Sequence, residues 1–219
     1  RAYEQAGRAL ERVFECVPPG STAECRLRLE LVRCAIGRGN YAAAGFELDA
    51  LDPASCRLYK TEALYLKALV AAYTFQTDTA QRLVDSLFSY GFDTTTLAAL
   101  RSLLTQYAEH DFIHPLIAHG LSRSLPGAGH WYAGKKARGI QAALLMSALS
   151  GAVVYTGYRA WESTGKHRFV FGMDTGLLIV AVWQRYWNGI KKGAYDAAVL
   201  SNATFQYEFR EQLDRLRGF

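Results

Sequence analysis

The sequence predicts an all-α protein in which short helical repeats precede a two-helix transmembrane hairpin and a C-terminal amphipathic helix. The first half reads as short amphipathic helices separated by brief turns. Two long stretches nearly free of charge follow, at about 139–161 and 169–187, and each is long enough to cross a hydrocarbon core of about 30 Å. The third observation is the helical pattern of residues 193–217, whose apolar side chains lie near one face: Val199, Phe205, Phe209, Leu213 and Leu216.

Composition divides the 219 residues into two unlike halves. The chain is 50% hydrophobic and 21% charged, but these averages mix a soluble helical domain at 1–110 with a membrane domain at 111–219. The net charge of +5 is concentrated beside the membrane segments. This distribution favours membrane lipids over nucleic acid as partners, and no RNA-binding or DNA-reading signature is present. The basic residues are Lys135, Lys136, Arg138, Arg185, Lys191 and Lys192.

Proline and glycine mark the ends of the expected helices in the first half. The first helix ends at residues 18–20, Pro-Pro-Gly, since proline removes a backbone donor and glycine permits the turn. Thr22 is expected to cap the second helix, and Gly37 with Gly39 to close it. The later helices of this half are expected to be short and antiparallel to their neighbours.

A shift of the chain by 39 residues superposes apolar residues of two successive helix pairs. This pattern resembles the tetratricopeptide repeat over about residues 22–108, although the period is a few residues longer than the usual unit. Ala44 and Pro53 stand about where that family keeps a small residue and a closing proline. The resemblance implies a solenoid that presents a surface for partners and carries no chemistry of its own; the alternative is another small helical bundle. The superposed pairs are Leu27 with Leu66, Leu31 with Val70, Tyr41 with Ala80, Ala44 with Leu83, and Leu48 with Leu87.

The two long apolar stretches predict a transmembrane hairpin with a short polar tip. Small residues recur every four positions at Ala143, Ser147 and Gly151, where another helix can approach closely. Gly172 and Gly176 form a similar small-residue stripe on the second span. The simplest interpretation is that the two stripes allow the helices of the hairpin to pack against each other. The alternative is a pair of buried helices in a soluble protein. Aromatic residues that suit the headgroup level stand near the ends of both spans: Trp161, Phe169, Trp183, Tyr186 and Trp187.

Asp174 is the acid expected inside the second span. An ionised carboxylate in a membrane is costly and usually has a partner, a water-filled cavity or a proton path. Asp174 lies about one and a half turns from the tip. A local pair with a tip backbone amide, or with one of three basic residues, is therefore the simpler interpretation. Those residues are Arg159, Lys166 and Arg168.

The stretch LPGAGHWYAGKKARG, residues 125–139, precedes the first span and has the glycine-lysine spacing of a phosphate-binding loop. However, Lys136 stands where such a loop needs Ser or Thr for magnesium. His130 and Trp131 would lie against the phosphates, and no buried strand precedes the stretch. Nucleotide binding is therefore not expected.

The same stretch carries a Pro-Gly-x-Gly-x-x-Tyr-x-Gly signature directly before the predicted hairpin. It resembles a bacterial family of membrane domains of unknown function and is similar to the two-transmembrane-helix domain family. The resemblance covers about residues 120–205, and His130 stands where those families usually show Gln. It implies an architecture and no established activity. The signature residues are Pro126, Gly127, Gly129, Tyr132 and Gly134.

We expect these residues to form the turn through which the chain enters the membrane. Pro126 ends the preceding helix, and Gly127 and Gly129 allow positive φ and close backbone approach. Trp131 and Tyr132 suit the interface between water and lipid. The alternative is a specific lipid-headgroup pocket built from the same glycines and lysines. In either case three bases are expected to meet lipid headgroups: Lys135, Lys136 and Arg138.

Histidines are the main remaining candidates for a metal-binding or catalytic role. His110 and His114 have the one-turn spacing that suits a metal on a helix, but Pro115 would break that helix. Spacing fixes neither Glu109 nor Asp111 as a third ligand. No nucleophile elbow, zincin motif or kinase signature is present. We therefore expect no catalytic residue, no metal site, no cofactor and no enzyme activity.

All four cysteines fall in the first 56 residues, and an even number in one polar domain suits disulfides and an oxidising compartment. Cys25 and Cys34 would be about 13 Å apart on one helix, too far to bridge. Cys16 and Cys25 flank the turn of a helical hairpin, so the expected pairs are Cys16–Cys25 and Cys34–Cys56. The alternative is four buried free thiols in a cytoplasmic domain.

Three uses of the C-terminal helix stay open. It can lie on the membrane, fold back on the helical repeats or dock on a partner. Within it, Asn202 begins an Asn-Ala-Thr sequon, which is a glycosylation site only in a host that uses it.

Two classes of function remain. The first is a non-catalytic accessory or scaffold subunit of a larger bacterial membrane protein complex, with the repeats as docking surface and the hairpin as anchor. The second is a lipid-binding or transport-assisting membrane protein that uses Asp174 and the basic glycine turn. The basic residues outside the hairpin would place both termini in the cytoplasm. The cysteines favour the periplasmic side of the inner membrane instead, which we expect because long domains translocate largely regardless of charge and a cleaved signal peptide could fix the orientation.

Overall fold

The regular structure of this chain is helical. In the part of the chain that the computed structural model describes, no strand is present, so the all-α class is confirmed. The chain divides into two compact units, Arg1–His110 with Tyr207–Phe219, and Asp111–Gln206. The described residues are 2–52, 54, 56–162 and 166–217, with their side chains except those of residues 160 and 166–174.

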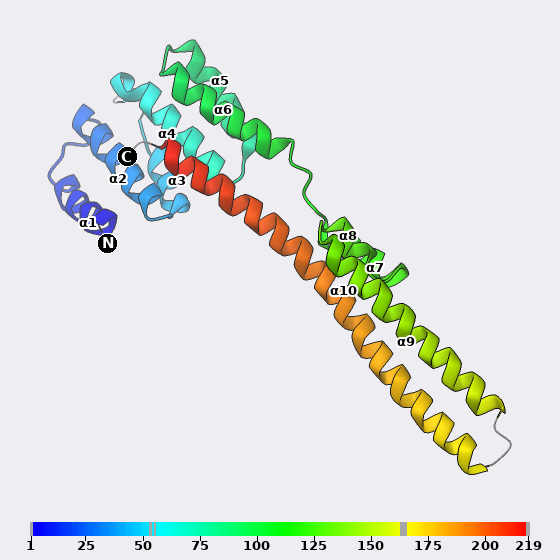
Figure 1. Ribbon diagram of the computed structural model, residues 1–219. Coiled ribbons are helices and arrows are strands. Elements are labelled where there is room, and N and C mark those ends of the chain that lie inside the picture. Colours follow the sequence, from blue (N-terminus) through cyan, green and yellow to red (C-terminus); the bar gives the residue numbers. More distant parts are fainter. Residues whose placement is uncertain (1, 53, 55, 163–165, 218–219) are drawn as a thin grey trace. The chain divides into compact units, whose positions relative to one another are not determined.

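Short helices joined by brief turns make up most of the first unit, as Figure 1 shows. Its elements are α1 (Ala2–Phe14), α2 (Thr22–Gly37), α3 (Tyr41–Asp49), the 3₁₀ turn η1 (Arg57–Tyr59), α4 (Lys60–Tyr73), α5 (Thr77–Ser89) and α6 (Thr94–Ala108). The helices that begin in the second unit are α7 (Pro115–Ser124), α8 (Ala128–Tyr132), α9 (Lys136–Glu162) and α10 (Lys166–Leu216).

Helix α2 is capped by Ser21 and not by Thr22. The backbone is still extended at Ser21, at φ −85° and ψ 156°, and its Oγ accepts the Glu24 N–H at 3.2 Å. The Glu24 carboxylate in turn accepts the Gly20 N–H at 2.6 Å. The prediction for Thr22 was wrong because this residue already belongs to the first turn, where its own N–H is among those that need a cap.

The turn between α2 and α3 and the turn between α4 and α5 have the same geometry. Gly39 and Phe75 both occupy the left-handed region, at φ 72° and 62°, and each N–H donates to the carbonyl three residues earlier. The next residue, Asn40 or Gln76, donates its N–H to the carbonyl five residues earlier and stands at the N-cap position of the following helix, where the Asn40 side chain also accepts the Ala43 N–H. These equivalent positions are 36 residues apart. The 39-residue alignment was wrong, because apolar residues recur along any amphipathic helix whereas the turns fix the register.

Buried side chains of the first unit repeat with the same spacing. Ala44 and Leu48 of α3 are buried, and so are Ala80 and Val84 of α5, 36 residues further on. The small residue in each pair lets antiparallel helices approach closely. Larger side chains fill the rest of this core: Leu29, Ile36, Leu66, Leu69, Leu87, Leu97, Leu100 and Leu104.

The C-terminal segment is the last part of α10 and not a separate helix over 193–217. Helix α10 runs without a break to Leu216, and from Tyr207 onward it belongs to the first unit, whereas the sequence placed all of 111–219 in the membrane domain. Phe209 and Leu213 are buried there. Of the three uses left open, the structure selects folding back on the first unit.

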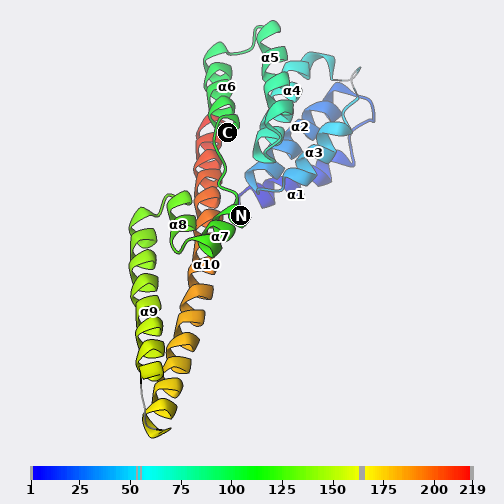
Figure 2. The same cartoon turned by 90° about the vertical axis from the view of Figure 1, so that its right-hand side faces the viewer.

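In the second unit, α9 and the first part of α10 run antiparallel and side by side, as Figures 1 and 2 show. The indole N–H of Trp183 donates to Ser150 Oγ at 3.1 Å. A Cβ placed on Gly176 would lie 3.9 Å from Thr156 Oγ1, in ordinary contact. The two helices therefore form a hairpin with direct contacts between them.

The predicted stripe of small residues on α9 is not what the second unit buries. Ala142 and Met146 are buried, whereas Ser147 and Gly151 are exposed, and a Cβ on Gly151 would meet nothing within 4 Å. Ser147 and Gly151 are therefore not the residues that the second unit buries, because a four-residue repeat fixes the spacing of a face but not its direction, and their use as a contact surface for another helix stays a prediction. Gly172 lies outside the described side chains.

Candidate functional site

The glycine turn, residues 126–134, links α7 to α9 through the single-turn helix α8. Gly127 is the residue before α8 and has φ 90°, and Gly134 closes α8 with φ 75°. Beyond α8, the Lys135 N–H donates to the His130 carbonyl at 2.7 Å, which satisfies one of the carbonyls left at the helix end. The two glycines thus supply the left-handed conformations that a side chain would strain.

Three glycines bring the backbones of this region into contact. A Cβ on Gly127 would lie 2.1 Å from the Gly139 carbonyl oxygen of α9, and one on Gly129 would lie 1.8 Å from the Ala118 carbonyl oxygen of α7. A Cβ on Gly139 would collide with the Trp131 ring at 1.9 Å. Because real Cβ atoms cannot approach so closely, these glycines let α7, α8 and the start of α9 pack backbone against backbone.

Hydrogen bonds inside the protein satisfy the amides of the turn. The Gly129 N–H donates to the buried Ser122 Oγ at 3.2 Å, and the N–H groups of His130 and Trp131 both donate to the Gly127 carbonyl. A phosphate-binding loop instead needs amides that point outward at the ligand. The geometry of the turn is therefore that of helix packing.

His130 is buried beneath the turn, with 7% of its surface exposed. A Cβ on Gly193 of α10 would lie 3.2 Å from His130 Nε2, so the imidazole occupies the space this glycine leaves. Among the residues that the structure describes, none bonds to its Nδ1. Burial lowers the pKa of His130 and the charge of Arg138 lowers it further, which favours the neutral ring.

The segment before α7 is fixed by a side-chain amide. Asn202 of α10 accepts the Ile113 N–H at 3.0 Å and donates to the Ile113 carbonyl at 2.8 Å. The Tyr132 Oη accepts the His114 N–H at 3.3 Å. The sequon asparagine is therefore engaged in the fold, and a glycan on it would break both bonds.

Small side chains form the core of this region. Ala118 and Ala133 meet three alanines of α10, and Ile113 packs against them. Such a core lets helices approach more closely than leucine would allow. The alanines of α10 are Ala194, Ala197 and Ala198.

The predicted interfacial side chains are exposed. Trp131 and Tyr132 project from α8 with 57% and 40% of their surfaces exposed. The headgroup candidates Lys135, Lys136 and Arg138 are exposed at the start of α9. Their positions suit contact with lipid headgroups, and that role stays a prediction.

Helix α9 is long and apolar enough to cross a membrane, judged by length and composition. The span runs from Lys136 to Arg159 with a mean hydropathy of 1.4, and 17% of it is buried within the protein. So little burial is unlike a core helix of a soluble protein. No other helix in the described part of the chain meets this criterion, and the predicted second span overlaps residues 166–174, whose side chains are not described. Asp174 is one of these residues, so the predicted roles of its side chain fall outside the described residues.

The histidine pair at His110 and His114 does not share a helix. Helix α6 ends at Ala108, His114 precedes α7, and Pro115 is the first residue of α7. Within the described residues, no group of three or more His, Cys, Asp or Glu side chains could hold a metal ion.

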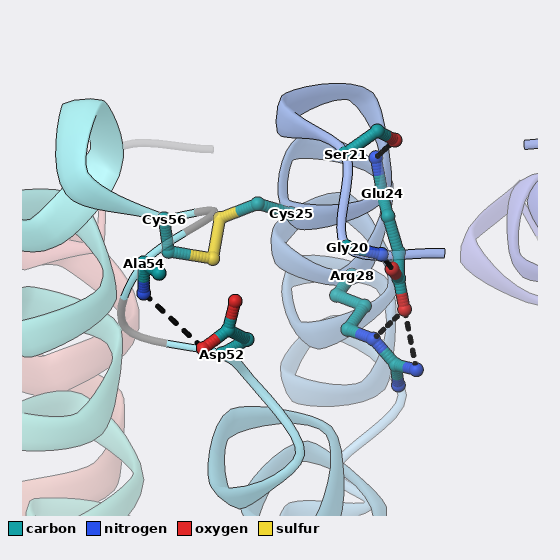
Figure 3. The surroundings of a disulfide bond; sticks show 8 residues. All are labelled: Gly20, Ser21, Glu24, Cys25, Arg28, Asp52, Ala54 and Cys56. Atoms are coloured by element: carbon teal, nitrogen blue, oxygen red, sulfur yellow. Dashed lines mark hydrogen bonds and ion pairs between the residues drawn. A yellow bond between two sulfur atoms is a disulfide. The ribbon is translucent and has the colours of Figure 1, made fainter. Parts of the chain in front are cut away.

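The disulfide joins Cys25 to Cys56, with a Cα–Cα distance of 5.4 Å (Figure 3). The predicted pairs were wrong, because Cys25 lies on the same buried face of α2 as Leu29 and so is directed to the segment that follows α3. Cys16 and Cys34 are free thiols, the first exposed beyond the end of α1 and the second buried in α2. The bond closes a loop between α2 and η1.

Sequence reasoning missed the structural roles of four residues of this site. Ser122 read as an ordinary polar residue of a helix and Asn202 only as the start of a sequon, since nothing in one sequence reveals a tertiary hydrogen bond. Gly139 and Gly193 carried a signal, because an isolated glycine in a helical pattern weakens the helix and usually has a reason in close contact. Each of them accommodates a neighbouring ring.

Comparison with known proteins adds no relative. No family model, no curated protein and no solved structure matches this chain.

Proposed function

We propose that this protein is a non-catalytic accessory or scaffold subunit of a larger bacterial membrane protein complex. The observation that carries the proposal is α9, a helix of membrane-spanning length with mostly exposed apolar side chains, in a chain that also has a separate helical unit. Leu144, Val154 and Trp161 expose 66%, 71% and 88% of their surfaces. Such a surface is stable in lipid and unfavourable in water. In this proposal α9 and α10 form a transmembrane hairpin.

The first unit supplies the docking surface in this proposal. Its helix pairs repeat every 36 residues, which supports a tetratricopeptide-like solenoid. A groove of about 410 Å³ lies between α2 and α4 and is also lined by Phe92 and Arg217. It combines an Arg33–Glu62 ion pair with the stacked rings of Tyr65 and Phe92, and aromatic residues and arginine are enriched at protein interfaces.

The disulfide supports a periplasmic position for the first unit at the inner membrane. Disulfides persist in the periplasm and are rare in the bacterial cytoplasm. Cys16 is an exposed free thiol, so its labelling reports on which side of the membrane the first unit lies. A membrane-impermeant maleimide should label Cys16 in intact spheroplasts, and the Cys16→Ser variant is the control. Labelling only after lysis would place the first unit in the cytoplasm.

The close contacts at Gly127 and Gly129 support the scaffold role over the lipid-binding alternative. A headgroup pocket built from these glycines would need space and free amides, whereas both positions are in contact with neighbouring backbone. In the scaffold role the turn is architectural. The same reasoning assigns Lys135 and Lys136 to general headgroup contact.

Co-purification tests the proposal. The tagged full chain, solubilised from native membranes in mild detergent, should bring down a larger assembly in fixed stoichiometry. Phe92→Arg in the groove should weaken that association, while Phe46→Arg, an exposed residue of α3, is the matched control. A chain that elutes alone with bound phospholipid, and no partner after cross-linking, would contradict the scaffold role and favour the lipid-binding alternative.

A further inference from the structure

Helix α7 has one face buried in the protein and one apolar face that is exposed. Ala118 and Ser122 are buried against the rest of the second unit, with 0% and 1% of their surfaces exposed. On other sides of the helix, Leu116, Ile117 and Leu121 expose 67%, 49% and 38%. Three large apolar side chains on a ten-residue helix are more than a soluble surface normally leaves in water.

The charges that follow this face along the chain, up to Arg159, have one sign. Between Asp111 and Glu162 the sequence contains no acidic residue. Arg123 lies in the last turn of α7, and the exposed Lys135, Lys136 and Arg138 follow in the glycine turn and α9. An apolar face with these bases on its C-terminal side is complementary to a surface that is apolar within and anionic at its boundary.

The position of α7 is fixed relative to the start of α9. Gly129 holds α8 against the α7 backbone at Ala118, and Gly127 holds it against the α9 backbone at Gly139. Figure 2 shows α8 beside the first turn of α9, with α7 close by. Helix α7 therefore lies near the end of the span where the chain enters it.

We propose that α7 is an in-plane membrane helix that seats its Leu116, Ile117 and Leu121 face in the interface of an anionic phospholipid bilayer. Amphipathic helices of this kind bury their apolar face about 5–10 Å into the boundary between headgroups and acyl chains. The inference rests on the proposed insertion of α9 and adds a second, shallow contact with lipid. The occupant is a lipid surface because the flanking bases suit anionic headgroups and the face continues from the predicted span.

Fluorophores at single cysteines test this in the full chain. The background is Cys16→Ser with Cys34→Ala, which keeps the disulfide, and an environment-sensitive dye is attached at Ile117→Cys, Leu144→Cys or Phe46→Cys. The protein is reconstituted in vesicles of phosphatidylcholine with phosphatidylglycerol. Quenching by aqueous iodide is compared with quenching by lipids brominated near the headgroup or near the chain end.

The expected result separates three depths. The dye at Ile117 should be quenched by the shallow brominated lipid and protected several-fold from iodide, whereas the dye at Phe46 should respond to iodide alone. The dye at Leu144 should respond to bromine near the chain end. A dye at Leu116 should repeat the result for Ile117, which guards against disruption by one substitution.

Other outcomes overturn the inference. If Leu144 lies in lipid while Ile117 is open to iodide, α7 is outside the membrane although the hairpin proposal stands. If Ile117 is shielded from both quenchers, protein covers the face, and a second copy is then the candidate. If Leu144 itself is open to iodide, the proposed insertion of α9 fails first.

Discussion

The Tyr73 hydroxyl donates a 2.6 Å hydrogen bond to Asp214, 141 residues further along the chain, and so ties α4 to the last turns of α10. Tyr73 is 1% exposed, and burial together with this bond raises the pKa of its hydroxyl. Beside it, Arg210 lies over the Phe75 ring at 4.7 Å, and the Tyr65 hydroxyl donates to the Leu216 carbonyl. The end of α10 is therefore an integral part of the first unit.

Removal of a buried side chain from that end should destabilise the first unit. The Phe209 ring packs against the Tyr107 ring in a tilted arrangement, 4.5 Å between centroids, and is 3% exposed, so Phe209→Ala should lower the free energy of unfolding by about 3–5 kcal/mol. Tyr207→Ala is the control, because Tyr207 is 70% exposed and should change stability little. Urea unfolding of the detergent-solubilised chain, followed by far-ultraviolet circular dichroism, measures both. Equal stability of the two variants would mean that the α10 end is only loosely attached.

Acid should destabilise the second unit through His130. Its pKa is lowered in the folded chain, first by burial and then by Arg138, so the unfolded chain binds the proton more readily. The contribution of neutral His130 to the free energy of unfolding should therefore be fully present above the ordinary histidine pKa of about 6.5. It should be lost as the pH falls below that value. Thermal unfolding at pH 7.5 and 5.5 checks this. His130→Gln should reduce the difference between the two midpoints, whereas His119→Gln on α7 should keep it.

Glycines of the turn should differ in their tolerance of alanine. Gly134 needs only a positive φ, since a Cβ there would meet nothing within 4 Å, and Gly134→Ala should cost about 1–2 kcal/mol. Gly129→Ala forces a Cβ onto the Ala118 carbonyl, so α7 must move. The loss in free energy of unfolding should therefore exceed that of Gly134→Ala, which is the control. Thermal midpoints and protease sensitivity of α7 in micelles give the comparison. Similar midpoints for both variants would argue against backbone contact between α7 and α8.

The sequence predicted the helices more reliably than their contacts. Helix ends were visible because proline and glycine act locally, as at Pro115 and Gly39. The 36-residue spacing of the two turns was missed in the sequence because Phe75 takes the left-handed conformation that Gly39 takes in the earlier turn. A phenylalanine gives no sign of that conformation in a sequence. The assignment of Tyr207–Phe219 to the first unit depends on tertiary contacts across almost the whole chain.

The glycine turn could be found from the sequence, but its use could not. Spacing identified Gly127 and Gly129 as special, and Gly127 has the positive φ that only glycine adopts readily, whereas Gly129 is used for close backbone approach. The partners of these glycines, Gly139 and Ala118, come from other helices. A single sequence does not reveal which backbones approach one another, so the sequence predicted a membrane-entry turn, with a lipid-headgroup pocket as the alternative, and not the contacts of these glycines with α7 and α9.

The disulfide gives the sharpest remaining prediction. Alkylation of the denatured, unreduced protein should label two cysteines, Cys16 and Cys34, and alkylation after reduction should label all four. In the native protein only Cys16 should react, because burial raises the pKa of the Cys34 thiol and blocks access to it. Peptide mapping by mass spectrometry identifies the labelled sites.

Loss of the bond should also destabilise the first unit. The double variant Cys25→Ala with Cys56→Ala opens a loop between residues 31 positions apart, and chain entropy predicts a loss of about 3–4 kcal/mol. Cys16→Ala is the matched control and should leave the free energy of unfolding unchanged, since that thiol is exposed and unbonded. Four labelled cysteines in the unreduced protein would contradict the Cys25–Cys56 bond and remove the main support for a periplasmic first unit. No labelling at all would instead require Cys16 and Cys34 to pair, which their placement at the surface and in the core of the first unit opposes.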